Sequence, residues 1–192
     1  QMKRTMKRPI PSGRVKPNAA RRFGIYISVM GIIYLFSVVN IPTAAVAFLT
    51  LFLYLIIYTP LKMKTTWNTL IGAIPGALPT LGGWLAASGS LETGGWILFG
   101  ILFLWQIPHF FAIAWLYRHD YGRVGFKMLP SVDPSMRKTS AFSVLFCVLL
   151  ILCTTLLHLN GSAGKVFMWG SLLLGFTFLA LAIDASRGWT EV

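Results

Sequence analysis

Three groups of polar and charged side chains flank the long apolar stretches of this chain. They are Arg4, Lys7, Arg8 and Arg14; Tyr58, Lys62, Lys64 and Asn68; and Arg118, Asp120, Tyr121, Arg123 and Lys127. Arginine and lysine suit phosphate oxygens, and arginine can bind two of them at once. A carboxylate among these cations would hold a Mg²⁺ ion that bridges to the phosphate. The pattern therefore favours a magnesium–diphosphate site that includes Asp120. On spacing alone, a plain ion pair of Asp120 with Arg118 or Arg123 stays an open alternative.

A second candidate group lies inside an apolar stretch. Gln106 and His109 are about one helical turn apart, and polar side chains at such depth in a membrane are costly and are candidates for function. His109 has three open interpretations: contact with a bound ligand, ligation of iron, or a hydrogen bond to a neighbouring helix.

The elements that must position these side chains are six long apolar segments. They are roughly Phe23–Val39, Thr43–Thr59, Asn68–Ser88, Gly94–Tyr117, Ser140–Leu159 and Val166–Ile183. The chain is 56% hydrophobic and 11% charged, and its mean hydropathy of +0.70 excludes a water-soluble globular domain. Each segment approaches the length of about 20 residues that a spanning helix needs. No alternation typical of barrel strands is present. We expect an all-α, polytopic membrane bundle with six transmembrane helices.

The basic residues predict how the bundle is oriented. If each segment spans the bilayer, one face receives 16 of the 17 Lys and Arg residues and the other face receives only Lys165. Short loops rich in Lys and Arg stay on the cytoplasmic side. We therefore expect a basic cytoplasmic segment over residues 1–22 and a cytoplasmic active-site loop over residues 118–139, within one domain of residues 1–192. The net charge of +12 is explained by topology and contact with anionic lipid, so no nucleic-acid partner is expected.

The third segment is interrupted by small and helix-breaking residues. Pro75 and Pro79 share one helical face, and Gly72 and Gly76 form a small-xxx-small pair. A span this broken must be buried in protein or line a cavity, because lipid cannot satisfy the freed carbonyl groups. A kink that merely shapes the bundle and a cavity wall are compatible interpretations.

Several blocks resemble the UbiA superfamily of membrane prenyltransferases. The blocks are Met2-Lys3-Arg4-Thr5-Met6-Lys7-Arg8-Pro9, Tyr58-Thr-Pro-Leu-Lys62, Asn68-Thr-Leu-Ile-Gly72, Trp105-Gln-Ile-Pro-His109-Phe, Tyr117-Arg-His-Asp120-Tyr and Gly125-Phe-Lys-Met128-Leu. The resemblance covers the whole chain, and the Trp105 and Asp120 blocks are similar to the branch of the superfamily that farnesylates heme.

That resemblance implies an activity and roles for residues. Farnesyl diphosphate would lose diphosphate, a vinyl group of heme B would capture the farnesyl cation, and water would add to give heme O for heme-copper terminal oxidases. Asp120 would hold Mg²⁺, and Lys62, Arg123, Arg8 and Arg4 would bind diphosphate. Tyr58, Asn68 and Tyr121 would position the substrate, while Gln106 and His109 would lie near the porphyrin. The implied location is the bacterial cytoplasmic membrane, or the inner mitochondrial membrane in a eukaryote. Heme A synthase and the terminal oxidase assembly are candidate protein partners.

The chain also departs from the superfamily pattern. The superfamily's first motif, Asn-x-x-x-Asp-x-x-x-Asp, would fall before Gln1, and a second aspartate after Asp120 is replaced by Val124. By the same comparison, two helices would precede the chain and one would follow it. We therefore expect this piece to be inactive by itself.

Two alternatives remain. A related enzyme could use another aromatic acceptor, such as a quinone precursor, although the block from Trp105 to His109 argues against this. A heme carrier or a transporter would also suit broken helices and an intramembrane histidine.

Overall fold

The computed structural model describes residues 5–188, and within that range the secondary structure is helical and contains no strand. Six helical units are long and apolar enough to cross a membrane, which confirms the predicted fold class. These units are α1 (Pro17–Tyr34) continued by η2 (Leu35–Val39); α2 (Ile41–Phe52) continued by η3 (Leu53–Tyr58) and α3 (Thr59–Leu61); α4 (Asn68–Ser88); α5 (Thr93–Leu116); α8 (Arg137–Leu159); and α9 (Lys165–Gly188). Two short helices, α6 (Arg118–Arg123) and α7 (Leu129–Val132), lie between α5 and α8.

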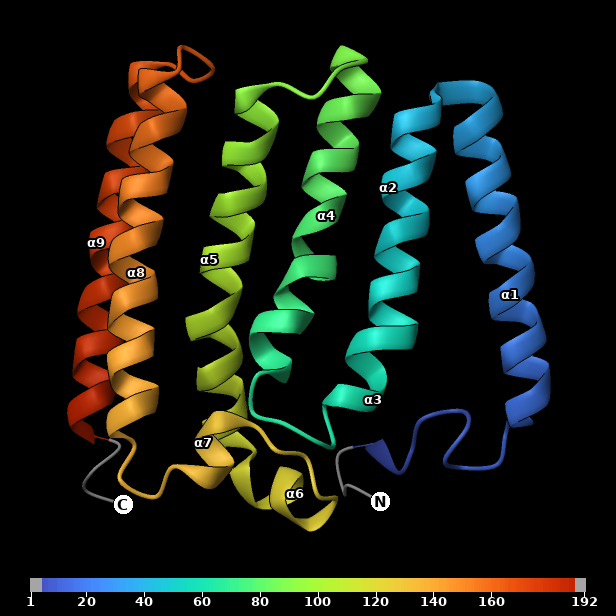
Figure 1. The fold of residues 1–192 in the computed structure, drawn as a ribbon. Coiled ribbons are helices and arrows are strands. Elements are labelled where there is room, and N and C mark those ends of the chain that lie inside the picture. Colours follow the sequence, from blue (N-terminus) through green and yellow to red (C-terminus); the bar gives the residue numbers. More distant parts are fainter. Residues whose placement is uncertain (1–4, 189–192) are drawn as a thin grey trace.

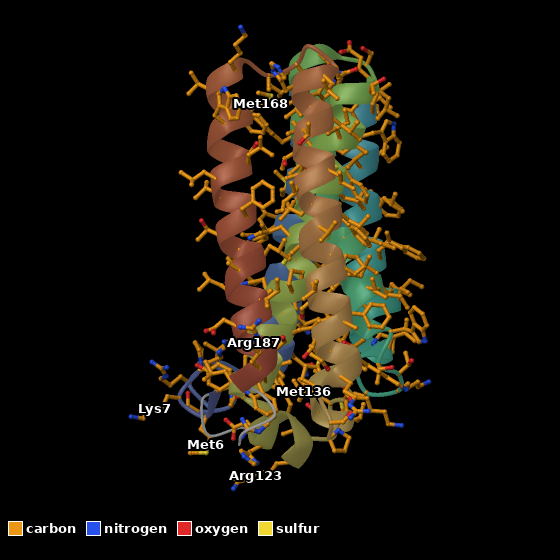
Figure 2. The ribbon with its side chains drawn as sticks, turned by 90° about the vertical axis from the view of Figure 1, so that its left-hand side faces the viewer. Met6, Lys7, Arg123, Met136, Met168 and Arg187 are labelled. Carbon is orange, nitrogen blue, oxygen red and sulfur yellow. The ribbon has the colours of Figure 1, made fainter. Side chains whose placement is uncertain are left out.

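The long helices stand side by side in chain order, as one row (Figure 1). Each long helix packs mainly on its neighbours in the sequence: α2 on α4, α4 on α5, α5 on α8, and α8 on α9. Seen along the row, α9 stands to one side of the other helices, so the row is bent (Figure 2). Successive long helices run in opposite directions. One end of the row therefore carries the N-terminal segment (residues 5–16), α3, α6 and α7 (Figure 1). Lys7, Arg123 and Arg187 lie at that same end and Met168 at the other, as the charge pattern predicts.

The core of the row lies around α4 and α5. One cluster joins Ala73 of α4 to Ile107 and Phe111 of α5 and to Phe146 of α8. A second cluster of leucines on α4 packs against α2 and η3 on one side and α5 on the other. Burial of these side chains holds α4 and α5 in fixed relation, and both helices line the candidate site described below.

Helix ends differ from the predicted segment ends. α1 begins at Pro17, where the fixed φ of proline suits the first turn, so Arg21 and Arg22 are helical rather than part of a loop. The predicted segments leave residues 40–42 between the first two spans, and this gap shortens to Asn40, which is the N-cap of α2. The Asn40 Oδ1 atom accepts from the Thr43 N–H at 2.8 Å, and Nδ2 donates to the Leu85 carbonyl at 2.8 Å. Asn40 thus joins the start of α2 to the end of α4.

The predicted loop 118–139 contains two short helices, α6 and α7. Where it meets α8, the side chain of Asp133 accepts hydrogen bonds from the first turn of that helix. Asp133 is 7% exposed, and its Oδ2 atom accepts from the backbone N–H of Thr139 at 2.9 Å and from its hydroxyl at 3.1 Å. Met136 directly before α8 has a φ of 52°, a left-handed conformation that is uncommon for a residue with a side chain. The carboxylate satisfies one backbone donor in the first turn of α8, at a helix N-terminus where negative charge is favoured. This fixes where the loop returns to the membrane.

Candidate active site

A cavity lies at the basic end of the row, between the N-terminal segment and the loops. We call it the cationic cavity; its volume is about 730 Å³. It is lined by Thr5, Arg8, Pro9, Ile10, Pro11, Val15, Ala20, Lys62, Tyr121 and Phe126. Two of the predicted phosphate-binding side chains, Arg8 and Lys62, therefore share one space although they lie far apart in the sequence. The arrangement suits an anion with several oxygen atoms.

A second cavity lies deeper, between η3, α4 and α5. We call it the aromatic cavity; its volume is about 360 Å³. It is lined by Tyr54, Tyr58, Thr69, Gly72, Gly76, Gln106, Phe110, Ile113, Tyr121 and Met128. Tyr121 lines both cavities, so the two spaces adjoin at this residue. A polar end and an apolar body of one ligand could each find a matching surface here.

The glycines of α4 give side chains their places in the aromatic cavity. A Cβ atom at Gly72 would lie 2.5 Å from Cε2 of Tyr58, and a Cβ atom at Gly76 would overlap Oε1 of Gln106. Gln106 is 6% exposed, and its Nε2 atom donates to the Leu102 carbonyl at 3.0 Å and to the Ala73 carbonyl at 3.4 Å. Gly72 and Gly76 therefore act as part of a cavity wall, one of the two interpretations that the sequence left open for this span.

Asn68 lies beside the cationic cavity but does not line it. Its side chain is fully buried, and Nδ2 donates to the Thr65 carbonyl at 2.6 Å and to the Lys127 carbonyl at 2.8 Å. Both amide hydrogens are therefore used within the protein. Asn68 ties the loop after α3 to the loop after α6, and its effect on a ligand would pass through those loops.

Asp120 and Arg123 lie on α6, near the cavities rather than in their walls. Asp120 is half-buried, next to Tyr121 in the chain, and within the described part of the chain it forms no ion pair with Arg118 or Arg123. Arg118 instead lies over the Trp115 ring, at 3.9 Å from the guanidinium carbon to the ring centroid. Arg123 is exposed at the far basic end (Figure 2). Arg4, the remaining predicted phosphate ligand, lies outside the described residues.

Gln106 and His109, the two candidate polar residues of α5, lie in different surroundings. Gln106 lines the aromatic cavity, whereas the His109 ring stacks on Trp105, with centroids 4.7 Å apart and planes at 15°. Trp105 itself lines a different, apolar groove of about 640 Å³ between α5, α8 and α9. Sequence spacing placed Gln106 and His109 about one turn apart, but only Gln106 reaches the aromatic cavity.

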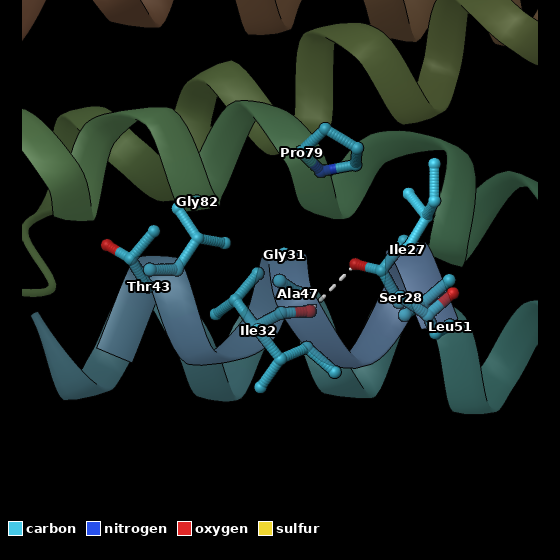
Figure 3. Close-up of a pocket in the computed structure, with 12 residues that line it drawn as sticks. Ile27, Ser28, Gly31, Ile32, Thr43, Ala47, Leu51, Pro79 and Gly82 are labelled. Carbon is cyan, nitrogen blue, oxygen red and sulfur yellow. Dashed lines mark hydrogen bonds between the residues drawn. The ribbon is translucent and has the colours of Figure 1, made fainter. Parts of the chain in front are cut away.

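A further groove lies beside α1, on the side of the row away from α9 (Figure 3). It measures about 390 Å³ and is bounded by α1 and α2 together with Pro79 and Gly82 of α4. Both apolar grooves are bounded by helices two places apart in the row, α1 with α4 and α5 with α9. The lining of both grooves is mostly apolar, which suits contact with a hydrocarbon chain.

A Mg²⁺ ion fits this chain only in part. No group of three or more His, Cys, Asp or Glu side chains gathers anywhere in residues 5–188, so the described protein groups alone do not form a complete metal site. Mg²⁺ is commonly bound by one or two carboxylates together with substrate phosphate and water. Asp120, a carboxylate that forms no ion pair with any residue in the range 5–188, fits that arrangement as a single ligand.

The packing and the cavities define a polytopic membrane protein whose spans hold adjoining cationic and aromatic spaces at one end. Comparison with known proteins gives the family: the profile of the UbiA prenyltransferase family matches residues 1–190. The chain belongs to the UbiA prenyltransferase family, as the sequence blocks predicted.

Its relatives carry a more specific name. Protoheme IX farnesyltransferase of Solibacter usitatus is 46% identical over 179 residues, which are 93% of this chain and 61% of that protein. The protein of the same name from Salinibacter ruber is 49% identical over 93% of this chain and 63% of its own length, and that of Sorangium cellulosum is 40% identical over 98% and 67%. The chain thus spans about three fifths to two thirds of the length of these relatives. No solved structure matches it.

Three structural features were not predicted from the sequence. They are the contacts of Tyr58 and Gln106 with glycines of α4, the hydrogen bonds of Asp133 to the start of α8, and the position of Phe126 in the cationic cavity. The glycine pair was visible in the sequence as a small-xxx-small pattern. Asp133 and Phe126 depend on how separate loops fold together, which no local pattern indicates.

Proposed function

We propose that the protein to which this chain belongs transfers the farnesyl group of farnesyl diphosphate to a vinyl group of heme B, with addition of water, to form heme O. The observation that carries the proposal is the meeting of the cationic and aromatic cavities at Tyr121. The names of the relatives, at 40–49% identity, support the choice of both substrates.

Binding of the diphosphate would use the cationic cavity. Arg8 and Lys62 line it and would hold the phosphate oxygens, with Arg123 of the nearby α6 as a further candidate. Arg4, outside the described residues, stays a candidate from the sequence. Asp120 would hold Mg²⁺, which supplies charge that neutralises the departing diphosphate. Fixed positive groups aimed at the leaving oxygens stabilise the transition state more than the ground state, because negative charge grows there as the bond breaks.

The reaction itself balances as an ionisation followed by capture. The C1–O bond of farnesyl diphosphate breaks and its electron pair leaves with the diphosphate. The π electrons of a heme vinyl group then form the new C–C bond, and the carbocation left on heme takes up water, which loses one proton. Tyr58, Tyr121 and Gln106 border the aromatic cavity and would orient the reacting ends. Exclusion of bulk water by the apolar walls would protect the first cation until capture.

His109 remains a candidate for contact with the porphyrin. Its ring and the Trp105 ring stack, and together they offer a flat aromatic surface beside the groove between α5, α8 and α9. Asn68 would act by holding Lys62 and Lys127 in register rather than by contact. We infer a bacterial cytoplasmic membrane because the relatives are bacterial. The basic end would face the cytoplasm, because the topology expected from the sequence assigns 16 of the 17 Lys and Arg residues to that side.

The test is product formation by the full-length protein in membranes supplied with heme B, farnesyl diphosphate and Mg²⁺, with heme O detected by mass spectrometry. Asp120→Ala and Lys62→Ala should abolish product, whereas Cys147→Ala, in the buried scaffold of α8, should retain it. Full product in both charge variants would refute the assigned site. Heme that is bound but recovered unmodified would favour a carrier instead.

A further inference from the structure

One side chain of the cationic cavity has no assigned role. Phe126 lies in the loop between α6 and α7, and its ring lies between two residues that the proposed reaction uses. The Lys62 Nζ atom is 5.3 Å from the Phe126 ring centroid, within the range of a cation–π interaction. The Tyr121 ring of α6 stacks on Phe126 with centroids 5.7 Å apart and planes at 27°. All three side chains line the cationic cavity.

The backbone holds this stack from both sides. The Phe126 N–H donates to the Tyr121 carbonyl at 3.0 Å, and the Lys127 N–H donates to the Lys62 carbonyl at 3.2 Å. The buried amide of Asn68 then fixes the Lys127 carbonyl at 2.8 Å. These bonds fix the backbone that carries the ring relative to Tyr121 and to the loop that bears Lys62.

A lysine side chain has four rotatable bonds and loses much of its freedom when its ammonium group is fixed on an anion. An aromatic ring that already holds the ammonium in the cavity removes part of that loss before the anion arrives. The ring offers no lone pair and no negative charge, so it competes only weakly with phosphate oxygens for the three N–H donors of the ammonium group. A hydrogen-bonding or anionic holder would occupy some of those donors.

We propose that Phe126 is a positioning residue for diphosphate binding: its ring holds the Lys62 ammonium group in the cationic cavity and stacks Tyr121 where the two cavities meet. This inference rests on the proposed function, because it takes Lys62 as a diphosphate ligand.

The experiment replaces Phe126 with a series of ring-fluorinated phenylalanines in the full-length protein. Successive fluorine atoms weaken the attraction of the ring for a cation while its size changes little, so the fold is kept. The readout is the Kd of inorganic diphosphate with Mg²⁺, measured by calorimetry in detergent, beside KM for farnesyl diphosphate and kcat. The same substitutions at Phe176, an exposed residue of α9, serve as the matched control.

We expect diphosphate Kd to rise stepwise with fluorination, by about two- to fivefold at full substitution, with KM following and no change for the Phe176 series. Phe126→Trp should bind at least as well as the wild type, because indole is the strongest cation–π partner, and Phe126→Leu should bind as weakly as the most fluorinated variant. The Phe126 series should have no effect in a Lys62→Ala background.

Two results would overturn the inference in different ways. A flat fluorination series, with Lys62→Ala still losing diphosphate affinity, would refute the role of Phe126 and leave the proposed function standing. Full diphosphate affinity in Lys62→Ala would remove Lys62 from the site, and the proposed function would lose its main cation along with this inference.

Discussion

Replacing Gly76 with alanine should displace Gln106 from the wall of the aromatic cavity. The added methyl group would overlap the Gln106 Oε1 atom, with Cδ at 3.0 Å and Nε2 at 3.2 Å, so the whole amide must move. Its hydrogen bonds to the Leu102 and Ala73 carbonyls would then stretch or break. Gln106 is 6% exposed, so water cannot easily replace those partners.

The magnitude follows from a comparison within the same helix. Leaving a buried amide without partners costs about 1–3 kcal/mol, and overpacking costs a similar amount, with the two overlapping here. Alanine also favours helix over glycine by about 1 kcal/mol. Gly83→Ala isolates that gain, because a Cβ atom at Gly83 meets nothing within 4 Å. We therefore expect the free energy of unfolding of Gly76→Ala to be about 1–3 kcal/mol lower than that of Gly83→Ala. Because both variants gain the same helix propensity, this difference reports only the steric overlap and the lost hydrogen bonds.

The assay is reversible unfolding of the full-length protein in mixed micelles, followed by circular dichroism. A double-mutant cycle tests the cause. In Gln106→Ala the side chain that the new methyl group would meet is absent, so adding Gly76→Ala should lower the free energy of unfolding much less than it does in the wild type. Equal stability of the Gly76 and Gly83 variants would refute the reasoning. So would an undiminished cost of Gly76→Ala when Gln106 is already alanine.

Two further predictions concern helix starts. Asp133→Asn should lower the free energy of unfolding by about 0.5–2 kcal/mol and speed hydrogen exchange in the first turn of α8, because the amide is a weaker acceptor for the Thr139 donors; an effect no larger than that of exposed Asp184→Asn would contradict this. Asn40→Ala should cost about 1–2 kcal/mol in the same unfolding assay, because it removes both the cap of α2 and the bond to the Leu85 carbonyl. Unchanged stability in Asn40→Ala would show that the two helices need no such link.

The spans, and the gathering of basic residues at one end of the row (Figure 2), were predictable because both depend on composition and charge pattern alone. Which side of the membrane that end faces stays a prediction. A run of apolar side chains long enough to cross the bilayer is helical whatever its neighbours, and the 16-to-one charge asymmetry needs no tertiary information. Helix ends were less predictable. Arg21 and Arg22 were expected in a loop, yet Pro17 starts the helix and the long arginine side chains can extend from it toward the polar surface.

That some candidate residues lie together was predictable from the sequence, whereas their phosphate and metal chemistry stays a prediction. Residue types pointed to phosphate and metal, and Arg8, Lys62 and Tyr121 do share a cavity. The separation of Gln106 from His109 depends on how α5 packs against α4, where Gln106 lies against Gly76. The contact between Lys62 and Phe126 joins two loops distant in the chain, so only the folded structure reveals it.

The most direct test of the central claim locates the isoprenoid substrate. A farnesyl diphosphate analogue with a photoreactive group on its isoprenoid chain should crosslink residues of the aromatic cavity, such as Phe110 and Met128, when irradiated with the full-length protein and Mg²⁺. Excess inorganic diphosphate should abolish that labelling. Labelling confined to exposed side chains of α8 such as Leu152, or labelling that diphosphate does not reduce, would contradict the claim that an allylic diphosphate binds where the two cavities meet.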